Sequence, residues 1–70
     1  MERINVRSSN ISSIGFDDSS EVLEVSFKGG GVYEYSGVPK SVFEGLQSAQ
    51  SVGKMLNAVV KGRYPYKRVS

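Results

Sequence analysis

An apolar alternation that runs into a glycine triplet does most to limit the folds open to this chain. The residues before Gly29-Gly30-Gly31 place apolar side chains on alternate positions, at Leu23, Val25 and Phe27. A period of two gives a strand one apolar face, and glycine tolerates the positive φ that tight hairpin turns require. The triplet therefore predicts a β-hairpin whose second strand covers residues 32–36.

An earlier hairpin is predicted from the polar turn Asp17-Asp18-Ser19-Ser20. The stretch before this turn carries Ile11, Ile14 and Phe16. Asp and Ser favour turns because their side chains hydrogen-bond to nearby backbone groups, so we interpret the acidic pair as a turn and not as a metal site. Three antiparallel strands in a meander are expected, and residues 3–7 are predicted to add a short extension.

Two short helices are predicted after the strands. Proline is favoured at the first helical position, so the first helix is expected to begin near Pro39. Ser51 is a good N-cap for the second helix, and Gly62 is suited to ending it. Apolar residues recur at helical spacing in both segments, at Val42, Phe43, Leu46 and Ala49 and at Val52, Met55, Leu56 and Val59.

These segments predict an α+β fold in which a three-stranded antiparallel meander is followed by two helices packed on one face, in the order β-β-β-α-α. Seventy residues suffice for one domain and not for two, so residues 1–70 are expected to form a single unit. Pro65 interrupts regular pairing, and residues 63–70 are therefore predicted to be a loose or extended C-terminal tail.

Composition argues against catalysis, cofactors and metal binding. The chain has no cysteine and no histidine, which removes disulfides, imidazole bases and the usual zinc ligands. No serine has an evident activating base, so no catalytic residue is expected. The longest apolar runs are far shorter than the roughly twenty residues of a membrane span, and a cytoplasmic location is expected.

Positive charge is concentrated in the last third of the chain. From residue 45 onward there are five basic residues and no acidic one. The five are Lys54, Lys61, Arg63, Lys67 and Arg68, and Tyr64 and Tyr66 lie between them. Cations contact phosphates while aromatic rings stack on bases, so this segment is a candidate RNA-binding site. The alternatives are an ordinary solvated surface, or a tail that its tyrosines anchor to the domain.

Tyr33 and Tyr35 form a second candidate site. Strand geometry places both rings on one face of a strand that we expect at the sheet edge. They either stack on bases or pack in the core beneath the first helix, and core packing is the favoured interpretation for so small a domain. Glu34 and Glu24 lie on or near the same sheet and would repel phosphates.

Several segments in fixed order resemble the KTSC domain. They are Ser8-Ser9-Asn10-Ile11, Ile14-Gly15-Phe16-Asp17, Leu23-Glu24-Val25-Ser26-Phe27, Gly31-Val32-Tyr33-Glu34-Tyr35, Gly37-Val38-Pro39 and Ser48-Ala49-Gln50-Ser51-Val52-Gly53. The central Tyr-x-Tyr of that family is matched by Tyr33 and Tyr35. The resemblance implies a module that occurs at the C terminus of some lysyl-tRNA synthetases and alone in bacteria and phages. It assigns no catalytic residue and suggests RNA binding by association.

The leading hypothesis is therefore a small non-catalytic binding module that contacts RNA or tRNA through its basic C-terminal segment. The alternative is a protein-interaction or self-assembly module, with a protein partner or a second copy bound to an uncovered sheet edge or helix face.

Overall fold

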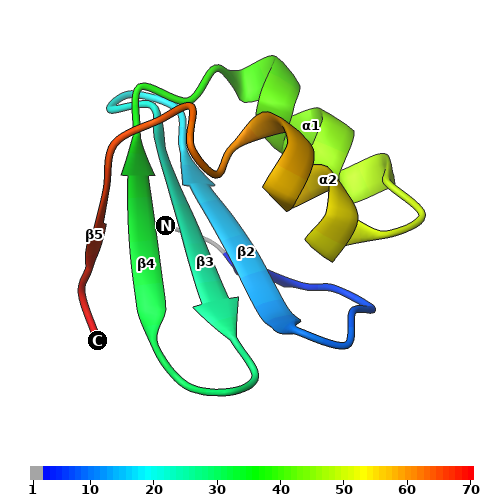
Figure 1. Ribbon diagram of the computed structural model, residues 1–70. Helices are drawn as coiled ribbons and strands as arrows, with labels where there is room; N and C mark the ends of the chain where they lie inside the picture. The colour runs from blue at the N-terminus through cyan, green and yellow to red at the C-terminus, as the bar shows by residue number, and fades with distance from the viewer. Residues whose placement is uncertain (1–2) are drawn as a thin grey trace.

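The structure is a computed structural model that describes residues 3–70. One antiparallel sheet carries both helices on one face, and its strands follow one another in sequence order (Figure 1). The strands are β1 (Arg3–Asn5), β2 (Ile11–Asp17), β3 (Val22–Phe27), β4 (Val32–Ser36) and β5 (Tyr66–Arg68), and the helices are α1 (Lys40–Ser48) and α2 (Val52–Val59). The expected α+β class is confirmed. Within residues 3–70, neither helix is long and apolar enough to span a membrane.

The expectation of three strands is wrong, because one short strand is added at each edge of the meander. The first of these, β1, lies within the short extension predicted at residues 3–7. In the first added pair Arg3 lies opposite Gly15, and in the second Tyr35 lies opposite Tyr66. Both added strands have three residues, all of them exposed, so they lack the apolar alternation that reveals a strand in sequence. As a result, β4 is an internal strand and not the sheet edge.

The part of the expected loose tail at residues 66–68 forms β5. The N–H of Ser36 donates to the carbonyl of Pro65 at 2.9 Å, and the N–H of Val69 donates to the carbonyl of Val32 at 2.8 Å. Pro65 stands just before the strand and contributes only its carbonyl, so its missing N–H breaks no ladder hydrogen bond. The tail is thus paired with β4 and forms one edge of the sheet.

Asp17 holds the turn between β2 and β3, as its residue type predicts. Its Oδ1 accepts hydrogen bonds from the Ser19 N–H at 3.1 Å and from the Ser19 hydroxyl at 2.8 Å. These bonds from Ser19, with others from Ser20, hold the pKa of the Asp17 carboxyl below its usual value. The carboxylate therefore organises the turn.

Glu21, in the same turn, has a φ of 54°, which is the left-handed conformation that glycine adopts without strain. We expect Glu21→Gly to raise the free energy of unfolding by about 1 kcal/mol, because the Cβ clash disappears. The Glu21 carbonyl, which accepts from the Val38 N–H at 2.9 Å, stays in place. Urea unfolding followed by circular dichroism measures the change. Ser20→Gly is the control, since Ser20 has no positive φ, and an unchanged midpoint for Glu21→Gly would contradict the prediction.

The helix ends agree with the sequence prediction. Pro39 immediately precedes α1 with a φ of −67°. At the start of α2 the Ser51 hydroxyl accepts from the N–H of Lys54 at 3.3 Å, as an N-cap should. Gly62 follows α2 with a φ of 79°, which turns the chain back toward the sheet.

The core lies between the helices and the sheet. Gly45 lets the helices approach, because a Cβ at that position would lie 3.3 Å from Cε of Met55. The Phe16 and Phe43 rings stack with centroids 5.1 Å apart, which fastens α1 to β2. The buried apolar residues are Ile11, Ile14, Leu23, Val25, Tyr35, Val38, Leu46, Val52, Leu56 and Val60. In Figure 1 the helices lie toward β2, whereas β4 and β5 extend to the other side of the sheet.

Candidate functional site

Tyr33 and Tyr35 stand side by side on the face of the sheet that carries the helices. Tyr35 lies opposite Leu23, a core residue, and directly opposed residues share a face. Tyr35 is only 3% exposed, so it is part of the core. Tyr33 is half-buried and keeps part of its ring accessible. The two rings of the Tyr-x-Tyr sequence thus differ in burial.

The strand β5 adds a third tyrosine to this pair. Tyr66 is 63% exposed, and its ring centroid lies 5.8 Å from that of Tyr33 and 5.6 Å from that of Tyr35. On the other side, Phe27 meets the Tyr33 ring edge to face with centroids 5.5 Å apart. These separations are those of favourable aromatic pairs. Four rings from β3, β4 and β5 therefore form one continuous aromatic surface.

This surface forms one side of a pocket of about 490 Å³, which we call the aromatic pocket. Its lining residues are Phe27, Gly30, Tyr33, Tyr35, Lys61, Gly62 and Tyr66. The sheet supplies the rings, and the turn after α2 supplies Lys61 and Gly62. The volume falls within the range of about 300–1,000 Å³ that is typical of pockets for small molecules. The pocket can therefore receive a flat ring.

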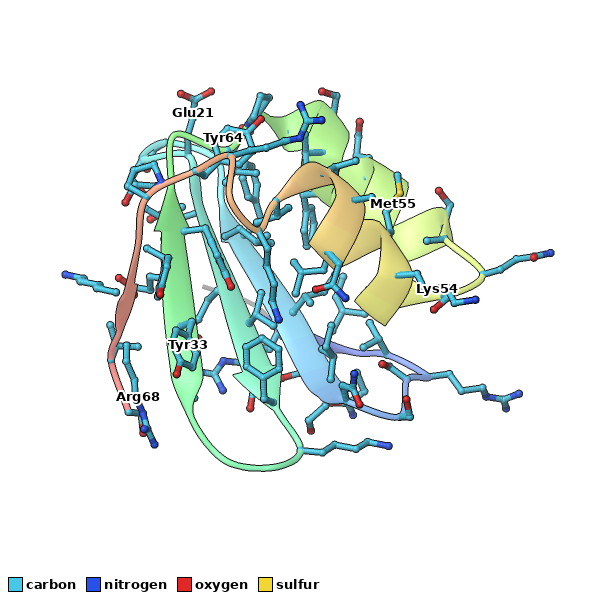
Figure 2. All side chains as sticks on the ribbon, viewed as in Figure 1. Glu21, Tyr33, Lys54, Met55, Tyr64 and Arg68 are labelled. Carbon is cyan, nitrogen blue, oxygen red and sulfur yellow. The ribbon has the colours of Figure 1, made fainter. Side chains whose placement is uncertain are left out.

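Two cations accompany the rings. The Lys61 ammonium lies 5.2 Å from the centroid of the Phe27 ring, which is within the range of a cation–π contact. Arg68 lies opposite Tyr33 in the β4–β5 pairing (Figure 2). Of the described residues that line the pocket, none is acidic. The electrostatic potential there favours a neutral or anionic ligand.

Gly31 lets the Tyr33 ring and the Arg68 side chain lie close to the backbone of the turn between β3 and β4. A Cβ at Gly31 would lie 3.1 Å from the Tyr33 ring and 3.4 Å from Nε of Arg68, and the φ of Gly31 is +96°. The Arg68 Nε also donates to the main-chain oxygen of Ser70 at 2.9 Å. Within the glycine triplet predicted as a turn, Gly31 thus leaves room for the Tyr33 ring, and Gly30 lines the pocket.

Burial raises the pKa of Tyr35, and the negative charges that Tyr66 and Tyr33 would carry when ionised raise it further. The Tyr35 phenol therefore stays protonated at neutral pH and is able to donate a hydrogen bond. The described residues contain no group of three or more side chains suited to hold a metal ion.

The remaining predicted cations lie elsewhere. Figure 2 shows Lys54 on α2, on the opposite side of the domain from Arg68. Arg63 donates through Nε to the carbonyl of Ala58 at 3.2 Å, at the end of α2. The Lys67 ammonium lies 4.0 Å from Oε1 of Glu34, on the sheet face opposite the pocket. Tyr64 is half-buried against the core.

Of the predicted site residues, four line the pocket, namely Tyr33, Tyr35, Lys61 and Tyr66, and Arg68 lies beside Tyr33 without lining the pocket. It does not bring Lys54, Arg63, Tyr64 or Lys67 to the pocket. Sequence reasoning missed Phe27 as a site residue, although its position on the apolar face of β3 was a usable signal.

The acidic residues of the sheet lie away from the pocket. Glu24 and Glu34 are directly opposed on β3 and β4, and they alternate with the core and pocket residues of those strands. Glu24 forms a salt bridge with Arg3, and Glu34 is paired with Lys67. The carboxylates expected to repel phosphates therefore face the other side of the sheet.

Comparisons with known proteins agree on one family. The family model of the KTSC domain matches residues 7–64. An uncharacterised protein of Stutzerimonas stutzeri is 39% identical over 70 residues, with 99% of each chain covered. A lysine–tRNA ligase of Nostoc punctiforme is 36% identical over 60 residues, which cover 86% of this chain and 11% of the ligase. The crystal structure of a KTSC domain protein from Yersinia pestis superposes with a TM-score of 0.95 at 36% identity, and the match covers 99% of this chain and 97% of the other.

Proposed function

Because this chain belongs to the KTSC domain family, we propose that it is a non-catalytic module that binds single-stranded RNA in the aromatic pocket. The observation that carries this proposal is the grouping of four rings with Lys61 and Arg68. A cytoplasmic location, where tRNA is found, is part of the same proposal.

The pocket offers both contacts that single-stranded RNA requires. Tyr66 and Tyr33 present accessible aromatic faces, and stacking of one base on such a ring contributes about 1–3 kcal/mol. Lys61 lines the pocket and is placed to meet a phosphate there, and Arg68, beside Tyr33, supplies a second positive charge on the same side of the sheet. Together these contacts support a Kd of about 1 μM, which corresponds to a binding free energy of about −8 kcal/mol.

The relatives support RNA as the ligand class. A stretch similar to this chain lies within the lysine–tRNA ligase of Nostoc punctiforme, where it makes up about a tenth of the protein. The name of that relative describes an enzyme that acts on tRNA. A module that binds unpaired nucleotides would add to the affinity of such an enzyme for RNA, because RNA held by the module has a higher effective concentration at the rest of the enzyme.

Fluorescence anisotropy with a labelled RNA decamer tests the proposal. We expect the single strand to bind in the micromolar range and the duplex to bind more weakly, because paired bases cannot enter the pocket. With two phosphate contacts, raising the salt from about 50 mM to about 200 mM should weaken binding about sevenfold. No binding of the single strand at the lower salt concentration, or a preference for the duplex, would overturn the proposal.

The second candidate function is self-assembly, and a shallow groove on the outside of the helices favours it. The groove has a volume of about 470 Å³ and is lined mainly by small or apolar residues of both helices and of the turn between them, Gly45, Ala49, Gln50, Ser51, Lys54, Met55 and Ala58. Burial of this surface by a second copy would add stability to a small domain. Light scattering over a hundredfold concentration range tests this candidate, and a constant monomer mass would exclude it.

A further inference from the structure

The aromatic pocket already contains a cation of its own. The faces of aromatic rings are electron-rich, so a box of rings ordinarily attracts a cationic ligand. Here the Lys61 ammonium lies 5.2 Å from the centroid of the Phe27 ring and takes the place of such a cationic ligand. A second cationic ligand would meet repulsion from Lys61 inside the pocket and from Arg68 at its rim.

The position of Lys61 is fixed by the end of α2. Its N–H donates to the carbonyl of Leu56 at 3.0 Å, the same carbonyl that accepts from the N–H of Val60 at 2.9 Å. The next residue, Gly62, turns the chain with a φ of 79°. The backbone therefore directs the Lys61 side chain toward the sheet, and this side chain joins the lining of the pocket.

The size of the pocket limits the ligand further. A volume of about 490 Å³ has room for one base with its sugar and phosphate, but not for a run of stacked bases. Among the four rings of the pocket, Tyr66 is the most exposed, at 63%, so it offers the stacking face.

We infer that the aromatic pocket holds one nucleotide, with its base against Tyr66 and Tyr33 and its phosphate at Lys61. Lys61 makes the pocket prefer a nucleotide, which carries a phosphate, over the corresponding nucleoside. This inference rests on the proposed RNA-binding function and deepens it. The same chemistry is offered by a free mononucleotide and by one unpaired nucleotide within RNA, and the experiment separates these two sources.

The test uses NMR to follow the amide signals of Gly30 and Gly62, which line the pocket. The protein is titrated separately with AMP, with adenosine and with an RNA decamer of adenosine nucleotides. We expect AMP to bind about tenfold more tightly than adenosine, because a phosphate accepts charge-assisted hydrogen bonds from Lys61. Lys61→Gln should abolish this difference by weakening the binding of AMP about tenfold. Lys54→Gln is the matched control, since Lys54 lies outside the pocket, and it should keep the difference.

Each outcome decides a different point. Equal binding of AMP and adenosine by the unaltered protein, or an unaltered preference in Lys61→Gln, overturns the role of Lys61. Binding of the decamer without binding of AMP overturns the single-nucleotide pocket but leaves the proposed function standing. Displacement of the decamer by AMP supports a shared pocket for both sources. Absence of binding by all three ligands overturns the proposed function itself.

Discussion

Leu46→Ala is expected to lower the free energy of unfolding by about 3 kcal/mol. Leu46 is fully buried, and it is the one buried residue of α1. Its truncation removes apolar contacts and leaves a cavity between α1 and the sheet. A domain of this length has a total stability of only about 4–10 kcal/mol, so the loss is a large fraction of what holds it folded.

Urea unfolding followed by far-ultraviolet circular dichroism measures this loss. Gln47→Ala is the matched control because Gln47 is the next residue of the same helix and is exposed. The control should change the stability by less than about 0.5 kcal/mol. Similar midpoints for the two variants would show that α1 is not anchored through Leu46.

Tyr66→Ala is expected to weaken binding of the RNA decamer between about 5-fold and 150-fold, because the substitution removes one stacking contact. Tyr66 presents most of its ring to solvent and lies within 6 Å, centroid to centroid, of both Tyr33 and Tyr35. Its removal therefore takes away a stacking face while costing little burial. The unfolding midpoint is expected to change much less than it does in Leu46→Ala.

Anisotropy titration with the labelled decamer measures the affinity, and Tyr66→Phe is the control. Phenylalanine keeps the ring and removes only the hydroxyl, so this variant should bind RNA within about twofold of the unaltered protein if stacking dominates. An affinity that Tyr66→Ala leaves unchanged would contradict a stacking role for this residue. A large loss in Tyr66→Phe would instead assign the contact to its hydroxyl.

The central fold follows from local sequence patterns. Alternation at Leu23, Val25 and Phe27 predicted β3, and the glycine triplet predicted its turn into β4. Ser51 predicted the start of α2 through its capping hydroxyl. In each case the physical signal lies within a few neighbouring residues, so it is readable without tertiary structure.

The edges of the sheet and the composition of the site depend on contacts between distant segments. Residues 66–68 become a strand only because β4 offers them hydrogen-bonding partners. The contact of Lys61 with Phe27 joins the end of α2 to the end of β3, which no local pattern encodes. The cations of the predicted basic segment are neighbours in sequence, but the fold distributes them over different faces of the domain.

The shortness of β5 has a consequence for affinity. A strand of three residues at the edge of the sheet, separated in sequence from its partner β4 by both helices, opens more readily than the longer pairing between β2 and β3. Whenever it detaches, Tyr66 and Arg68 leave together, and only the docked population is competent to bind. The observed Kd then equals the intrinsic value divided by that competent fraction, so substitutions that loosen β5 weaken binding without altering any ring.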